Sequence, residues 1–298
     1  MEYIIGTKIN DPKAVAKVKE EYEKKLASME ETIAGLKGVD KKSKDEALAA
    51  FKKGDFSRAR ELFLKIREKE RKRQQELNKE AAVTAYRLGD IAYLELDFKG
   101  ALDYYLEAER LDPGNTLYTT EVGKAYYTLA KYTKAKEYFE KSLEIDLKTY
   151  GDKHPSVAIR LNNMGAASSA LGEARKAISY YERALAIDKA VYGERHPNVA
   201  VELNNLGRGW GDLGEAKKAI GYYEQALAID KEVYGERHPG VAIDLNNLGR
   251  TWGDLGEVTK AVKCLEASYG IFREFYGEDH PDTKNSKKEL DSLKQSKK

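Results

Sequence analysis

The apolar positions of the chain recur with the period of an α-helix. Leu203, Leu206, Trp210 and Leu213 are three or four positions apart, so they share one helix face. Gly214 follows them and favours a turn. A second apolar stripe comes after it and consists of Ala216, Ala219, Ile220, Tyr223, Ala226 and Leu227. The pattern therefore predicts two helices that form a hairpin.

The hairpin pattern recurs along the chain. A phrase of the type YGERHP returns at intervals of 42 residues and contains all four histidines, which are His154, His196, His238 and His280. A second phrase, LNNMG or LNNLG, returns at the same interval, at residues 161, 203 and 245. Internal repeats of this length are typical of solenoids, because one hairpin cannot bury its apolar face alone and its copies must stack.

The histidine phrase marks the end of each hairpin. We expect the second helix to run on to a glycine such as Gly235, a C-cap candidate. Pro239 then prevents continuation and disfavours the α conformation at His238. We interpret the histidines as capping or packing groups, because copies one repeat apart lie too far from each other to share a metal ion.

The spacing of Gly207, Trp210, Ala219, Tyr223 and Ala226 resembles the tetratricopeptide (TPR) consensus. Earlier copies share it, and their matching positions include Ala47, Gly54, Phe56, Ala59, Phe63, Gly89, Phe98, Ala101, Tyr105, Ala108, Gly123, Tyr126, Tyr132, Ala135 and Phe139. The copies of 42 residues resemble the kinesin light chain and nephrocystin-like subgroup. The resemblance covers about 245 of the 298 residues and implies an all-α, right-handed superhelical TPR solenoid of about six helix-hairpin repeats.

The resemblance also sets the expected organisation of the chain. We expect an N-terminal segment at residues 1–38, a solenoid at 39–283, and a capping helix and tail at 284–298, where Leu290 and Leu293 would cover the open core. The repeats are expected near residues 40–81, 82–115, 116–157, 158–199, 200–241 and 242–283.

The N-terminal segment contains one long predicted helix at residues 12–36, with Asp11 as its N-cap and Pro12 at its first position. Its apolar seam consists of Val15, Val18, Tyr22, Leu26, Met29, Ile33 and Leu36. Two alternatives are open: the helix packs on the first repeat, or it forms a coiled coil that binds a partner or a second copy of the chain. Residues 2–9 are short and apolar, and form either a strand or the remnant of a larger upstream region.

Composition and charge exclude several classes of protein. The net charge is +2, which gives no general attraction to nucleic acid, and no run of about 18 apolar residues exists that could span a membrane. The single cysteine, Cys264, rules out a disulfide framework and favours a reducing compartment, so we expect a cytoplasmic protein.

No catalytic chemistry is predicted. Residues 209–214 match G-x-G-x-x-G, but they lie at the end of a predicted helix and not between a strand and a helix, as a dinucleotide loop requires. No acidic residue recurs as an isolated polar group on an apolar stripe. We therefore expect no enzyme, no cofactor and no metal site.

Paired asparagines within the first helix of each hairpin are the strongest functional signal. An asparagine side chain both donates and accepts, so it can hold a peptide backbone whatever the peptide's sequence. The TPR resemblance implies that these helices line a concave groove. The candidate peptide-binding residues are Asn162, Asn163, Asn204, Asn205, Asn246, Asn247, Arg208, Arg250, Lys124, Tyr127 and Tyr93. The alternative is that one asparagine of each pair bonds the neighbouring helix.

The expected function is a non-enzymatic scaffold that binds an extended peptide or a partner protein in this groove. Arg208 and Arg250 predict a ligand with a hydrophobic anchor and acidic residues. Two alternatives are a regulatory module of a larger signalling system and a self-assembling array that pairs through residues 12–36. Acidic residues on the same helices, among them Asp212 and Asp254, argue against nucleic acid as a partner.

Overall fold

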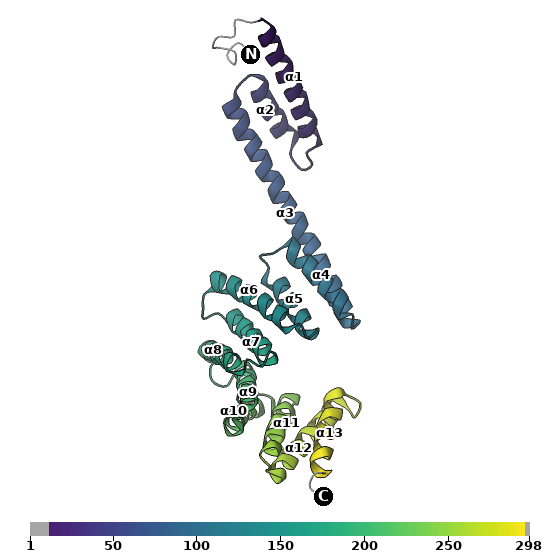
Figure 1. Cartoon of the computed structure of the whole chain (residues 1–298), viewed down its shortest axis with the longest axis vertical. Helices are drawn as coiled ribbons and strands as arrows, with labels where there is room; N and C mark the ends of the chain where they lie inside the picture. Colours follow the sequence, from purple (N-terminus) through teal and green to yellow (C-terminus); the bar gives the residue numbers. More distant parts are fainter. Residues whose placement is uncertain (1–11, 296–298) are drawn as a thin grey trace. The chain divides into compact units, whose positions relative to one another are not determined.

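The computed structural model describes residues 12–295, with the side chains of 12–19, 21 and 22 left out. All elements in this range are helices (Figure 1). They fall into two compact units, which divide between Thr84 and Ala85. None of the described helices is long and apolar enough to cross a membrane. The predictions for residues 2–9 and for Asp11 concern positions outside the described residues.

The first unit contains α1 (Pro12–Gly35), α2 (Lys41–Lys52) and the beginning of α3 (Phe56–Leu94). Asp40 caps α2, because its carboxylate accepts the Ser43 amide hydrogen at 2.8 Å. The core of the unit consists of Val39, Ala47 and Ile66, with Leu36, Leu62 and Phe63 packed around it. Ile33 is also buried. The C-terminal part of the predicted seam thus packs within this unit, as the packing alternative predicts.

One helix, α3, spans 39 residues and is longer than the sequence pattern suggests. It combines the second helix of the first hairpin with the first helix of the next, and no turn occurs near the expected repeat boundary at residues 81 and 82. Residues 65–88 contain neither glycine nor proline, so nothing in the backbone stops the helix. Exposed ion pairs such as Lys65 with Glu61 add support along its side.

The second unit is a stack of helix hairpins (Figure 1). After the end of α3 and α4 (Phe98–Leu111) come four hairpins. We call their first members A helices: α5 (Thr116–Thr128), α7 (Pro155–Ala170), α9 (Pro197–Asp212) and α11 (Pro239–Asp254). We call their second members B helices: α6 (Tyr132–Tyr150), α8 (Ala174–Tyr192), α10 (Ala216–Tyr234) and α12 (Val258–Tyr276). Each A helix packs on its own B helix, and each B helix packs on the A helix or capping helix that follows.

Glycines end the helices where the sequence predicts. Gly214, between α9 and α10, has φ +76°. Gly235 ends α10 with φ 85° and ψ 167°. Both conformations are costly for a residue with a Cβ atom, so glycine sets the turn within the hairpin and the exit from it.

The histidines cap the A helices α7, α9 and α11 and the last helix, α13. The Nδ1 atom of His196 accepts the Asn198 amide hydrogen at 3.2 Å, and its ring stacks on Tyr192 with 4.3 Å between centroids. Pro197 is the first residue of α9. The same arrangement recurs at His154, His238 and His280. The predicted capping and packing role is confirmed, and the proline that stops one helix also begins the next.

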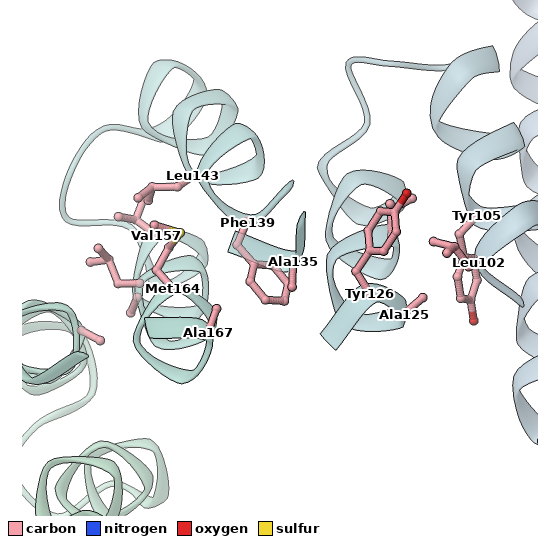
Figure 2. Close-up of a cluster of buried hydrophobic side chains, with 14 of the residues drawn as sticks. Leu102, Tyr105, Ala125, Tyr126, Ala135, Phe139, Leu143, Val157, Met164 and Ala167 are labelled. Carbon is pink, nitrogen blue, oxygen red and sulfur yellow. The ribbon is translucent and has the colours of Figure 1, made fainter. Parts of the chain in front are cut away.

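The core lies between the stacked layers, and Figure 2 shows its first part. Tyr105 of α4, Tyr126 of α5 and Phe139 of α6 are among its buried rings. Glycines on the A helices make room for such rings. A Cβ atom at Gly207 would lie 2.6 Å from the ring of Tyr223, so glycine at this position allows α9 and α10 to approach closely.

The last helix, α13 (Pro281–Gln295), packs on α12. Leu290 is buried, and Ser286 donates a long hydrogen bond of 3.4 Å to Ser268 of α12. Asp291 and Lys294 stand 42 residues after Gly249 and Trp252 of α11. The face that receives a B helix in earlier repeats is therefore charged in α13, as expected for a capping helix.

Candidate interaction surface on the A helices

Helical periodicity places one set of positions on a common side of each A helix. In α9 these positions are Val201, Asn205, Arg208 and Asp212, which are spaced four, three and four residues apart. Their equivalents lie 42 residues earlier or later in the other A helices. We call this side the A-helix face, and most of the sequence-predicted binding residues lie on it or at its edges.

The asparagines form an interhelical ladder beside this face. Asn162 of α7 donates through Nδ2 to Oε1 of Glu202 in α9, at 2.6 Å. Its Oδ1 accepts from Nδ2 of Asn205, also in α9, at 3.1 Å. One amide thus uses both its donor and its acceptor to join two consecutive A helices.

A second rung repeats the first between α9 and α11. Asn204 donates to the Asp244 carboxylate, and its Oδ1 accepts from Asn247 at 3.2 Å. Asn162 of the first pair and Asn247 of the third bond a neighbouring A helix, as the interhelical alternative predicts for one member of each pair. In the middle pair both Asn204 and Asn205 do so, which is more than this alternative predicts. The remaining member at the start of the ladder, Asn163, has a buried Nδ2 without a hydrogen-bond partner among the described residues.

The ladder ends at α13. The positions that follow Asp244 and Asn247 by one repeat are Ser286 and Glu289. The serine is too short to replace the carboxylate, and the glutamate side chain lacks the N–H donor of the asparagine amide. Oδ1 of Asn246 and Oε2 of Glu289 are both buried without a partner in the described structure. The last interface is therefore less tightly bonded than the two before it.

The two carboxyl groups in the ladder are buried. Glu202 is 3% exposed and Asp244 is fully buried, and one oxygen of each has no hydrogen-bond partner in the described structure. Burial disfavours their charged form and raises the pKa of Glu202 to about 8 and that of Asp244 to about 7. Nearby Asp188 and Asp230 raise these two pKa values further.

The expectation that no acidic residue recurs within the apolar stripes is wrong. Asp146, Asp188 and Asp230 follow one another at 42 residues on the B helices, and each is at most 8% exposed. Asp146 forms an ion pair with Arg160 at 2.8 Å. In the later copies the position of Arg160 is taken by Glu202 and Asp244, so Asp188 and Asp230 face carboxyl groups there. The signal was present in the sequence as an Ile-Asp pair in each copy.

Two hollows open on the A-helix face. The first measures about 450 Å³, and it brings together two predicted residues, Tyr127 and Arg208, with Asp212. The Arg208 guanidinium donates to the Tyr181 hydroxyl at 3.0 Å and to Oδ1 of Asn205 at 3.3 Å. These bonds fix the orientation of the cation beside the hollow.

The second hollow measures about 730 Å³ and lies between α11, α12 and α13. It brings together three predicted residues, Asn246, Asn247 and Arg250. Apolar side chains such as Leu265 and Leu293 also line it. This hollow therefore combines amide and guanidinium groups with an apolar wall.

Other predicted residues lie apart from these hollows. Lys124 of α5 forms an ion pair with Glu121 at 2.8 Å on the exposed surface. Tyr93, near the end of α3, packs edge-on against Phe98 with 5.3 Å between ring centroids. Neither residue lines the hollows described above.

Sequence reasoning missed an aliphatic row on the same face. Leu117, Ile159, Val201 and Ile243 succeed one another at intervals of 42 residues, one on each A helix. Their exposed fractions lie between 44% and 53%, although the side chains are aliphatic. The signal in the sequence is the aliphatic residue two positions before each LNN phrase, which a pattern of polar residues does not reveal.

Candidate chemistry elsewhere is limited. Gly209 and Gly211 lie inside α9 and not in a loop between a strand and a helix. Among the described residues, no group of three or more His, Cys, Asp and Glu side chains is arranged to hold a metal ion. Cys264 is half-buried, and burial raises the pKa of its thiol, which disfavours the reactive thiolate.

Comparison with known proteins shows which family the chain matches. One tetratricopeptide repeat family model matches residues 115–190, 161–209 and 211–252, and a second matches 245–282, together more than half of the chain.

Similar solved structures include the following two crystal structures. A kinesin light chain-like protein of Podosopora anserina with nearly identical TPR-like repeats is 25% identical, with a TM-score of 0.54, over 62% of this chain and 87% of that one. BtubC (BKLC) from P. vanneervenii is 24% identical, with a TM-score of 0.57, over 70% of this chain and 93% of that one. The structural neighbours of this chain include kinesin light chain-like repeat proteins, and the chain belongs to the tetratricopeptide repeat proteins.

Proposed function

We propose that the chain is a non-enzymatic scaffold whose A-helix face binds a segment of a partner protein. The TPR fold generally mediates protein–protein interactions. The observation that carries the proposal is that exposed aliphatic side chains, two hollows and the cations Arg208 and Arg250 occur on one face. Exposed apolar side chains that succeed one another across a surface mark interaction sites.

The chemistry of the face supports a ligand with an apolar anchor and acidic groups. The second hollow offers the apolar wall of Leu265 and Leu293. Arg208 and Arg250 stand 42 residues apart on successive A helices, where they can pair with carboxylates. The amides of Asn162 and Asn204 are already bonded within the ladder, so their contribution is to position the helices and not to contact the ligand.

The test compares two matched pairs of arginine substitutions. The first variant carries Arg208→Glu and Arg250→Glu. The control carries Arg195→Glu and Arg237→Glu, which are also 42 residues apart but lie in the loops before α9 and α11. Wild type and both variants are used to capture partners from a lysate of cells that express the chain, after circular dichroism has shown that each is folded.

We expect a partner that wild type and the loop variant retain and the A-helix variant loses. Equal retention by all three proteins would place binding elsewhere on the chain and contradict the proposal. Loss in both variants would show that general charge, not this face, determines binding, and would also contradict it.

A further inference from the structure

The aliphatic row of Leu117, Ile159, Val201 and Ile243 narrows the kind of segment that the A-helix face can bind. The inference rests on the proposed function and specifies the partner's conformation. Each member is about half exposed, and the row crosses four A helices in succession. A partner that covers the row must present one apolar side chain to each A helix it crosses, because burial of each member is favourable only against an apolar group.

The spacing between A helices sets the spacing required in the partner. Ladder hydrogen bonds join α7 to α9 and α9 to α11, so these A helices are neighbours in succession, and packed helices lie about 8–10 Å apart. Seven residues of an α-helix rise about 10.5 Å and return to nearly the same face. Residues three positions apart in a β-strand also lie about 10 Å apart, but their side chains point to opposite faces of the strand. A strand therefore cannot present a side chain to every A helix.

A polyproline II helix has three residues per turn, so every third side chain lies on the same side, about 9 Å from the one before. Polyproline II segments dock in aromatic-lined grooves, whereas amphipathic helices lay their apolar face into hydrophobic grooves in general. All four members of this row are aliphatic. An extended backbone also needs hydrogen-bond partners along its length, and Nδ2 of Asn205 and Asn247 already donates within the ladder. An α-helix satisfies its own backbone groups.

The charges on the A-helix face indicate which side chains one flank of a bound helix carries. Lys124, Arg208 and Arg250 lie seven residues after Leu117, Val201 and Ile243, so the cations follow the aliphatic row along one side. Carboxylates on the corresponding flank of a partner helix would pair with them. We propose that the A-helix face binds an amphipathic α-helix of a partner protein, with apolar residues at intervals of seven and acidic residues along one flank.

The experiment selects binders from a displayed library of random peptides. Each peptide has about 24 residues, which as a helix is long enough to cross four A helices. Selection uses the full chain. Selected peptides are then measured by fluorescence anisotropy against a row variant carrying Ile159→Lys and Val201→Lys. The control carries Val191→Lys and Val233→Lys, two exposed valines, also 42 residues apart, on the B helices α8 and α10.

We expect selected peptides to share apolar positions seven residues apart with Asp or Glu on one flank. They should gain helical circular dichroism on binding, and lose at least about tenfold in affinity for the row variant but not for the control. Selected peptides with apolar positions three residues apart, and with the same loss of affinity for the row variant, would contradict the proposal that the bound segment is helical. The proposed function would then still hold. Peptides that bind the row variant as tightly as wild type, or no selected peptides, would overturn both.

Discussion

Replacing Glu202 with Gln tests the physical account of the repeat interfaces. The Glu202 side chain is 3% exposed and accepts one hydrogen bond from Asn162, while its second oxygen has no partner in the described structure. Burial and the nearby Asp188 carboxyl raise the pKa of Glu202 to about 8 from its ordinary value of 4.5. Glutamine has the same shape as a protonated glutamic acid, keeps the acceptor for Asn162, and cannot ionise.

The pKa shift sets both the direction and the size of the effect. The folded chain holds the Glu202 proton more tightly than the unfolded chain, so its stabilising contribution is complete below pH 4.5 and is lost as pH rises through about 8. The whole shift corresponds to about 5 kcal/mol of unfolding free energy. About 4 kcal/mol of this falls between pH 5 and pH 9.

The assay is urea unfolding followed by circular dichroism at a series of pH values. We expect wild type to lose stability with rising pH, and Glu202→Gln to lose about 4 kcal/mol less between pH 5 and pH 9. The exposed Glu224 of α10 supplies a control, and Glu224→Gln should follow wild type. Parallel pH profiles for wild type and Glu202→Gln would refute the reasoning, because they would show that Glu202 is ionised at neutral pH in the folded chain.

Three further predictions concern packing and capping, each checked by the same urea unfolding at neutral pH. Gly207→Ala should destabilise the chain by about 1–2 kcal/mol, because its Cβ would lie 2.6 Å from the Tyr223 ring; unchanged stability would contradict this close contact. Gly211→Ala should instead stabilise by up to about 1 kcal/mol, because no atom lies within 4 Å of the added Cβ; a loss would reveal a hidden clash. His196→Ala should cost about 1 kcal/mol, because it removes the acceptor for the Asn198 amide hydrogen; no loss would exclude the cap.

The regular part of the fold follows directly from local sequence signals. Apolar spacing, the turn glycine Gly214 and the exit glycine Gly235 predict the hairpins, because these positions have few alternative conformations. The long helix α3 was not predicted, because a family pattern suggests a boundary near residue 81 where the backbone offers no reason to stop.

The site was only partly predictable, because the hydrogen-bond partners of polar side chains depend on how the neighbouring helices pack. The sequence identifies the Asn204 and Asn205 pair, but it does not show that Asn204 bonds forward to Asp244 while Asn205 bonds back to Asn162. Val201 looked like one more apolar residue of α9. Only its position beyond the buried stripe shows that it faces outward.

Site-specific photo-crosslinking measures most directly where a partner binds. A photoreactive phenylalanine analogue is introduced at Val201 on the A-helix face and, separately, at Val233 on the B helix α10. These two valines are exposed by 50% and 43%. After irradiation in a lysate of cells that express the chain, the account predicts a discrete protein adduct from position 201 and none from position 233. An adduct from position 233 with none from position 201 would contradict it.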